Sequence, residues 1–146
     1  MASKIILLGA DHAGFELKEA IKAHLAEKGI DVRDLTPEKI QGDDYPPIAK
    51  EAAEEVVKTD GQAILVCGSG MGMDIAANRI EGARAVVVRD EEEAKLSRQD
   101  DHANILVLGG RVTPAEKAIT ITDTWLATPY SKAKRHERRV KELDQP

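Results

Sequence analysis

The sequence predicts an α/β protein with a parallel sheet enclosed between two layers of helices. Short apolar runs alternate with amphipathic helical patterns along the chain, as in sheets that are covered on both faces. The 146 residues suffice for one hydrophobic core and are too few for two ordinary ones, so residues 1–146 are expected to form a single domain. In such folds ligands bind outside the carboxyl ends of the strands.

The first half of the chain supplies two strands and two helices. The apolar run 4–9 predicts a buried strand, and apolar residues at helical spacing over 14–29 predict a helix that Gly29 ends. Alternation over 30–35 indicates a short strand. After a polar loop, the Pro46–Pro47 pair favours the start of a helix over 48–58.

The second half repeats this alternation. Three further apolar runs are predicted strands: 62–67, 83–88 and 104–109. Each is followed by a predicted helix: 73–79, 90–99 and 113–125. Asp90 is suited to cap the second of these helices, and Thr113 is predicted to cap the third, with Pro114 at its first position. The result is a three-layer, Rossmann-like α/β/α domain with five parallel strands.

A basic segment, 131–141, follows Pro129 and predicts one more short helix. It has too little apolar surface to be held firmly by its own domain, so we expect it to pack on a partner subunit. The alternative is an exposed, frayed tail, because chain ends are commonly disordered.

Composition limits the function classes. The net charge of −5 argues against general affinity for nucleic acid or anionic membranes. No apolar run approaches the roughly 20 residues of a membrane span, and Asp11 and His12 follow the N-terminus too soon for a secretory signal. A cytoplasmic protein is therefore expected. The single cysteine excludes an internal disulfide and a cysteine-rich zinc site.

The most informative stretch is Gln62–Arg79, in which the only cysteine ends a strand and alternating glycines open a helix. Gly68, Gly70 and Gly72 allow a sharp turn whose N–H groups approach a ligand closely. Cys67 lies where a helix start would stabilise a thiolate and make it a usable base. The alternative is that Cys67 is a small buried hydrophobe.

Three other polar groups follow predicted strands: Asp11-His12 after the first, Tyr45 after the second and Arg111 after the fifth. Each signal is weak alone, and the glycine turn lacks the spacing of a dinucleotide fingerprint. Together with Cys67 they could converge in one crevice at the carboxyl edge of the sheet.

Five motifs in order along nearly the whole chain carry a more specific signal: GADHAGFELK, DYP at 44–46, CGSGMGMDIAANR, LSRQDDHANILVLGGR and RHERR at 135–139. They resemble the motifs of type B ribose-5-phosphate isomerases, a family that includes galactose-6-phosphate and allose-6-phosphate isomerases. The resemblance implies a homodimer or dimer of dimers with sites at the subunit interface, no metal and no cofactor. It also implies an enzyme of carbohydrate metabolism, in the pentose phosphate pathway, that interconverts ribose 5-phosphate and ribulose 5-phosphate.

The resemblance also implies roles for individual residues. Cys67 would move a proton between C1 and C2 of the open-chain sugar through a cis-enediolate. The N–H groups of Gly68–Gly72, with the Ser69 hydroxyl, would stabilise the oxyanion. The remaining binding residues would be Asp11 and Tyr45 for sugar hydroxyls or for orienting neighbours, Arg135 and Arg139 for the phosphate, and Arg111 and His12 in support.

One departure from the family pattern concerns ring opening. Members commonly carry a histidine directly after the Arg-Gln or Arg-Glu pair, whereas this chain has Asp100 there and His102 two residues later; Asn104 still matches. His102, His12 or Asp100 could open the ring, with His102 preferred. A naturally open-chain substrate, such as a tetrulose phosphate, would need no ring opener.

Other functions remain open at this stage. The chain could isomerise allose 6-phosphate, galactose 6-phosphate or a tetrulose phosphate instead. It could also be a non-catalytic phosphate-binding module or an inactive subunit of a mixed oligomer. The coincidence of Cys67 with the arginine pair Arg135 and Arg139 argues against the last two.

Overall fold

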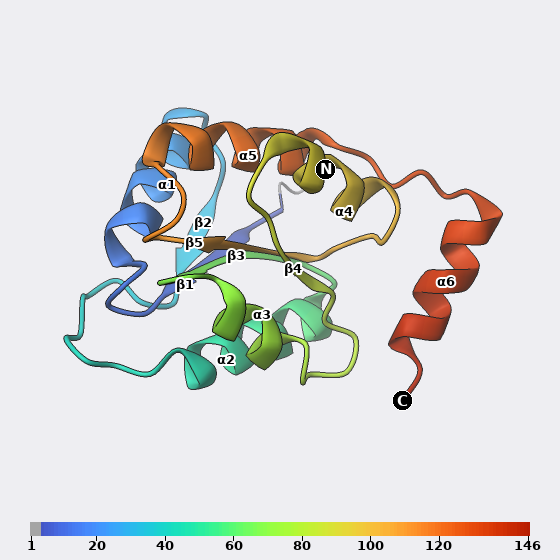
Figure 1. Cartoon of the computed structure of the whole chain (residues 1–146), viewed down its shortest axis with the longest axis horizontal. Helices are drawn as coiled ribbons and strands as arrows, with labels where there is room; N and C mark the ends of the chain where they lie inside the picture. Colours follow the sequence, from blue (N-terminus) through green and yellow to red (C-terminus); the bar gives the residue numbers. More distant parts are fainter. Residues whose placement is uncertain (1–3) are drawn as a thin grey trace.

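The computed structural model describes residues 4–146; residues 1–3, the first part of the segment tested above for a secretory signal, lie outside it. Five parallel strands form one sheet in the order β2-β1-β3-β5-β4 (Figure 1). The strands are β1 Ile6–Ala10, β2 Val32–Asp34, β3 Gln62–Cys67, β4 Ala85–Val87 and β5 Ile105–Gly109. The helices are α1 Phe15–Glu27, α2 Tyr45–Thr59, α3 Met71–Ala77, α4 Glu91–Gln99, α5 Ala115–Ala127 and α6 Lys134–Asp144. The predicted fold class is confirmed.

Helices α1, α4 and α5 cover one face of the sheet, and α2 and α3 cover the other (Figure 1). Successive strand residues point to opposite faces, so Leu8 and Ile64 pack with Trp125 of α5, whereas Leu65 packs with Ala53 of α2. All five side chains are fully buried. Burial of each large apolar side chain stabilises the fold by roughly 1.5–3 kcal/mol. Because the alternating pattern places such side chains on both faces of the sheet, it holds a layer of helices against each face.

The strand register brings three carboxyl ends to one level. Ala10 pairs with Val66 in the sheet, and Cys67 pairs with Gly109. The loops after β1, β3 and β5 therefore emerge side by side. In Figure 1 they lie at the left, together with the long loop between β2 and α2.

The two helix starts that lie next to prolines, those of α2 and α5, differ from expectation. Helix α2 begins at Tyr45, because both prolines fit in a first turn whose N–H groups have no partner within the helix. The prediction that Thr113 caps α5 is wrong: Pro114 has an extended ψ of 152°, so the helix begins at Ala115 without a side-chain cap. The cap predicted at Asp90 is confirmed, since its Oδ1 accepts a hydrogen bond of 2.8 Å from Glu93 N.

Helix α6 stands apart from the sheet, at the right of Figure 1, on the side opposite the carboxyl-edge loops. Arg84 Nη1 donates to both carboxylate oxygens of Asp144 at 3.0 and 2.9 Å. Near its start, Ser131 N donates to Gln99 O at 3.1 Å. The predicted basic helix is thus present and attached at both ends to its own chain. Among residues 4–146, no helix is long and apolar enough to cross a membrane.

Candidate active site

A cleft of about 400 Å³ opens at the carboxyl edge of the sheet. It lies among the loops after β1, β3 and β5 and the start of α2. Its lining residues are Asp11, His12, Ala13, Asp43, Asp44, Tyr45, Cys67, Gly68, Ser69, Gly72 and Arg111. The structure therefore brings together all four groups that were expected to converge after predicted strands.

Cys67 is the last residue of β3 and reaches the cleft floor with 4% of its surface exposed. The chain then turns through Gly70, whose φ of +86° is a conformation that favours glycine. Helix α3 begins at the next residue, Met71. The turn presents main-chain N–H donors beside the thiol, an arrangement suited to stabilising a negative charge that develops on a ligand.

Arg111 is held over this turn by main-chain hydrogen bonds between two loops. Gly110 N donates to Cys67 O at 2.7 Å, and Arg111 N donates to Gly68 O at 2.9 Å. Such closeness requires glycine at 109, where a Cβ would lie 2.7 Å from Ser69 O. The guanidinium of Arg111 consequently lies beside Gly68, and among the described residues that line the cleft it is the one permanent cation.

Asp11 and Ser69 also make local hydrogen bonds. Asp11 Oδ1 accepts hydrogen bonds of 3.0 Å from Ala13 N and Gly14 N, which fix the turn between β1 and α1. Ser69 Oγ accepts from Met71 N at 3.2 Å, which leaves its O–H free to donate. Both residues can thus serve a ligand while holding the loops that carry them.

Asp43 is a cleft residue that the sequence did not single out. Its Oδ1 accepts from His12 N at 2.7 Å and lies 3.1 Å from His12 Nδ1. The carboxylate comes from the loop before α2, 31 residues from the histidine. Its only sequence signal is a pair of aspartates before Tyr45, which is common in polar loops.

Three other candidates, Asp100, His102 and Asn104, lie at the amino edge of the sheet, away from the cleft of their own chain. Asn104 Oδ1 accepts from Arg84 N at 2.7 Å, so its amide links β4 to β5. His102 stacks on Tyr130 with ring centroids 4.3 Å apart. Burial, with the nearby Arg84 and Arg98 cations, lowers the pKa of His102.

Asp100 ends α4 and faces α6. Its Oδ1 is 3.6 Å from His136 Nε2, and His136 Nδ1 in turn lies 2.6 Å from Ser131 Oγ. Arg135 and Arg139 flank this buried histidine on α6, with both side chains exposed. The arginine pair therefore lies toward the amino edge of the sheet, whereas Cys67 lies at the carboxyl edge.

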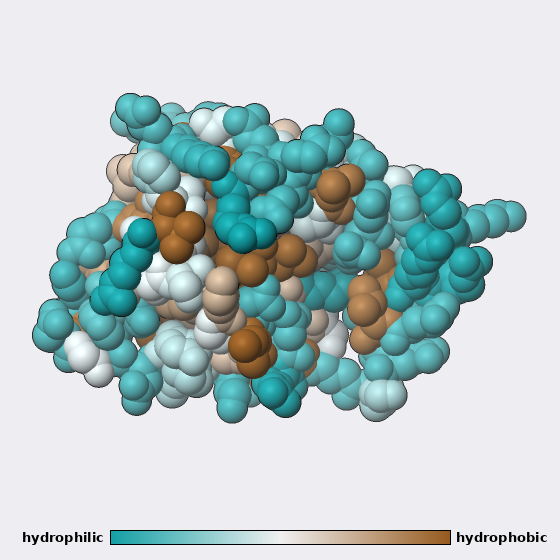
Figure 2. Space-filling view, viewed as in Figure 1, coloured by the Kyte–Doolittle hydropathy of each residue, from teal (hydrophilic) through white to brown (hydrophobic). Residues whose placement is uncertain are grey.

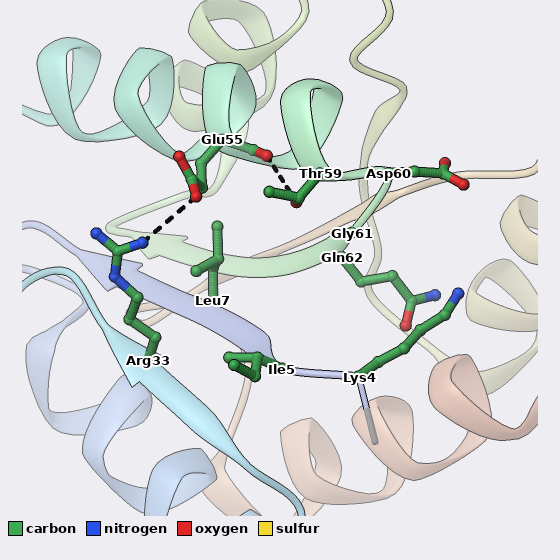
Figure 3. A pocket seen from close by; sticks show the side chains of 9 residues that line it. All are labelled: Lys4, Ile5, Leu7, Arg33, Glu55, Thr59, Asp60, Gly61 and Gln62. Carbon is green, nitrogen blue, oxygen red and sulfur yellow. Dashed lines mark hydrogen bonds and ion pairs between the residues drawn. The ribbon is translucent and has the colours of Figure 1, made fainter. Parts of the chain in front are cut away.

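A second cavity, of about 320 Å³, lies at the amino edge between β1, β2 and α2 (Figure 3). An exposed Arg33–Glu55 ion pair of 3.4 Å crosses it, and Lys4 and Gln62 approach from the other side. It offers neither a thiol nor an imidazole among its lining residues. No group of three or more His, Cys, Asp or Glu residues suited to a metal ion occurs in the described part of the chain.

Comparisons with known proteins decide the family. The family model described as Ribose/Galactose Isomerase matches residues 6–143. The chain belongs to the ribose/galactose isomerase family. It is therefore an isomerase, and the cleft around Cys67 is its candidate active site.

Individual members of this family cover nearly the whole chain. Ribose-5-phosphate isomerase B of Escherichia coli is 43% identical over 142 residues, 96% of this chain and 94% of the relative. The crystal structure of a ribose 5-phosphate isomerase from Thermotoga maritima has a TM-score of 0.93 at 43% identity and covers 98% of this chain and 99% of its own. The Mycoplasma genitalium enzyme with bound ribulose-5-phosphate has a TM-score of 0.93 at 37% identity, with 99% and 96% covered.

Proposed function

We propose that this protein interconverts ribose 5-phosphate and ribulose 5-phosphate. The observation that carries the proposal is the meeting of Cys67, the glycine turn and Arg111 in one cleft. A base, a set of fixed N–H donors and a cation are what an aldose–ketose isomerisation of an anionic sugar requires. The relative solved with bound ribulose-5-phosphate supports this substrate.

In the proposed mechanism, the Cys67 thiolate takes a proton from C2 of the open-chain aldose. The electrons move onto the carbonyl oxygen O1, giving a cis-enediolate. A proton then passes from O2 to O1, the C2–O2 bond becomes the new carbonyl, and Cys67 returns its proton to C1. Negative charge develops on the oxygen, so the N–H groups from Gly68 to Gly72 and the Ser69 hydroxyl act where the barrier lies. Asp11 and Tyr45, which both line the cleft, would hold sugar hydroxyls.

The phosphate is proposed to bind between two copies of the chain. Arg111 supplies one cation, whereas Arg135 and Arg139 are exposed on α6 and face away from their own cleft. A second copy would place this pair, one helical turn apart, beside the partner's cleft. An opening of about 450 Å³ under α6, lined by Val86 and the exposed Leu143, supports such packing, and apolar surface borders it in Figure 2.

The same proposal places Asp100 and Asn104 near the partner's cleft rather than their own. It also places the enzyme in the cytoplasm, where a free Cys67 stays reduced.

The test is an isomerase assay of the purified chain on ribose, allose and galactose phosphates and on an open-chain tetrulose phosphate. We expect the highest kcat/KM with ribose 5-phosphate, and a Cys67→Ala variant should be inactive under the same conditions. Absence of isomerisation of ribose 5-phosphate in either direction would disprove the proposed function. Higher kcat/KM with another sugar phosphate would keep the chemistry and change the substrate.

A further inference from the structure

The end of α4 and the start of α6 meet in a polar cluster formed by Asp100, Ser131 and His136. Ser131 Oγ lies 2.6 Å from His136 Nδ1, and Asp100 Oδ1 lies 3.6 Å from His136 Nε2. The side chain of His136 is 9% exposed and that of Asp100 is 35% exposed. The imidazole is therefore enclosed, whereas the carboxylate reaches the surface.

The hydrogen bonds of this cluster hold one carboxylate oxygen and leave the other open. Ser131 Oγ accepts from Ala133 N at 3.3 Å, so its own proton can be donated to His136 Nδ1. His136 Nε2 then carries a proton that faces Asp100 Oδ1, and Gln99 Nε2 donates to the same oxygen at 3.4 Å. Asp100 Oδ2 makes no hydrogen bond within residues 4–146, so it is available to a ligand.

The cluster lies beside the arginine pair that is proposed to hold the phosphate in the partner's cleft. His136 directly follows Arg135 on α6, and Arg139 is one turn further on. In ribose 5-phosphate, the ring oxygen joins C1, at the end of the sugar that Cys67 serves, to C4, next to the carbon that carries the phosphate. The groups beside the arginine pair are therefore expected to be the ones that the second copy brings to the ring oxygen.

Phosphate binding does not explain a carboxylate at this place. Like charges repel, so Asp100 opposes the attraction of an anion to Arg135 and Arg139. Among residues 4–146 its ion-pair partner is His136, which Ser131 already engages. A surface carboxylate with one oxygen held and the other open is suited to exchanging a proton with a bound sugar.

We propose that Asp100, positioned by His136, opens the furanose ring of a substrate bound in the partner's cleft; this inference rests on the function proposed above. Asp100 Oδ2 takes the proton of the anomeric hydroxyl, the C1–O1 bond becomes a double bond, and the bond from C1 to the ring oxygen breaks. The electron pair of the broken bond stays on the ring oxygen, which takes the same proton back from Asp100. Protons and electrons balance without a co-reactant.

His102, which the sequence favours for this step, faces another part of the amino edge. Its ring stacks on Tyr130, and its carbonyl accepts from Arg84 Nε at 2.9 Å. The charges that act on its ring include Lys4 and Asp60, which precede the central strands β1 and β3. Asp100 instead faces α6, on which the arginine pair lies.

The test compares a cyclic with an open-chain substrate in Asp100→Asn. Asparagine keeps the size of the side chain and an oxygen for His136, but it cannot carry a proton from one sugar oxygen to another. We expect kcat/KM for furanose ribose 5-phosphate to fall at least about 10²-fold, the scale of a lost acid–base group. With ribulose 5-phosphate, which cannot close a furanose ring, the initial rate should stay within about threefold.

Glu137→Gln is the matched control, because it also exchanges a carboxylate for an amide beside His136. Glu137 is exposed and is two residues from Arg135, so it lies on the opposite flank of α6. This variant should behave as the unaltered enzyme with both substrates.

Two variants test the positioning role of His136. Glutamine brings an N–H donor to about the place of Nε2, whereas phenylalanine fills a similar volume without a donor. The ratio of kcat/KM with ribose 5-phosphate to that with ribulose 5-phosphate should stay within about threefold in His136→Gln. It should fall about tenfold in His136→Phe, the scale of one hydrogen bond to a charged group. A merely structural defect would lower both rates and leave the ratio unchanged.

Mixed dimers identify the cleft in which Asp100 acts. When Cys67→Ala and Asp100→Asn are unfolded and refolded together, mixed dimers contain one site with Cys67 from one chain and Asp100 from the other. Conversion of ribose 5-phosphate should then rise well above that of either protein alone. No such rise, with mixed dimers demonstrated by mass spectrometry, would overturn the inference.

Three further results would also overturn it. Equal effects on both substrates in Asp100→Asn, whether losses or none, would remove the residue from ring opening. A larger loss in His102→Asn, confined to ribose 5-phosphate, would assign the step to His102. An unaltered enzyme that converts neither substrate would refute the proposed function itself, and the ring-opening role with it.

Discussion

The ring of Tyr45 lies directly against Gly72: a Cβ added to the glycine would stand 2.3 Å from Tyr45 Cζ. Tyr45 is the first residue of α2 and Gly72 the second residue of α3, and both helices cover the same face of the sheet. Their contact sets how far the tyrosine enters the cleft. The absence of a side chain at Gly72 therefore determines the position of the Tyr45 ring in the cleft.

Gly72→Ala should displace Tyr45, because real Cβ atoms do not approach other heavy atoms so closely. We expect kcat/KM to fall at least about tenfold, since overpacking costs about 1–3 kcal/mol and here shifts a cleft side chain. Gly29→Ala is the control for a glycine substitution, since a Cβ there meets nothing within 4 Å. Its positive φ of 73° will lower the melting temperature, while activity should persist. Unchanged activity in Gly72→Ala would show that the position of Tyr45 is unimportant.

Cys67→Ala should lower kcat by at least about 10³-fold, because loss of a positioned base costs about 10²–10⁴. Binding of a phosphate-bearing inhibitor should persist, since the N–H donors and Arg111 stay in place. Solvent-deuterium exchange at C2 measures the proton transfer directly. Exchange at the unaltered rate in the variant would remove Cys67 from this role.

Arg135→Ala and Arg139→Ala should each weaken binding of a phosphate-bearing inhibitor by about tenfold or more, the scale of one charge-assisted contact. Arg138→Ala is the matched control: it removes the same charge from the same helix, where Arg138 Nε is 3.9 Å from Glu142. Calorimetric titration gives the three affinities. Equal affinities in all three variants would move the phosphate site away from α6.

Mixing two inactive proteins tests whether the site is shared. If Cys67→Ala and the double variant Arg135→Ala/Arg139→Ala are unfolded and refolded together, mixed dimers will contain one intact site. Activity should then reappear, although each protein alone has little. No recovery, with mixed dimers demonstrated by mass spectrometry, would show that α6 serves its own chain.

Stability at acid pH should depend on Asp34. Burial favours its neutral form, but hydrogen bonds from Lys18 and Lys22 at 2.7 and 2.9 Å outweigh this and lower its pKa. A lowered pKa in the folded state stabilises the protein above the unfolded value of about 3.9, and that contribution disappears as pH falls through the folded value. Urea midpoints from pH 6 to pH 3 should fall more steeply for the unaltered protein than for Asp34→Asn. Parallel slopes would contradict this role.

Much of the fold follows from local patterns. The runs that became β3 and β5 are continuous and apolar, and Asp90 caps α4 as its side chain predicts. The predicted cap of α5, Thr113, was wrong, because Pro114 adopts an extended ψ and lies outside the helix. Strand order was not predictable, since the paired residues of β1 and β3, such as Ile6 and Gln62, are 56 positions apart in the sequence and no local signal encodes such pairing.

The site divides in the same way. Residues at or just after strand ends, such as Asp11, Cys67 and Arg111, could be placed in one crevice because parallel strands share a carboxyl edge. Asp43 could not, because it lies in a long loop whose path depends on tertiary contacts. The placement of Asp100 and His102 at the opposite edge follows from topology, since both precede β5 rather than follow it.

The turn after Cys67 offers donors that belong to the main chain, and this has a consequence for how such an enzyme can change. Proline apart, no exchange of a single side chain removes an N–H group, so the capacity to stabilise an anion is inherited with the backbone. Side chains at the rim, among them His12, Asp43 and Tyr45, can be exchanged one at a time. Such an enzyme can keep its main-chain donors while the side chains that contact the sugar change. This is consistent with a family whose description names both ribose and galactose.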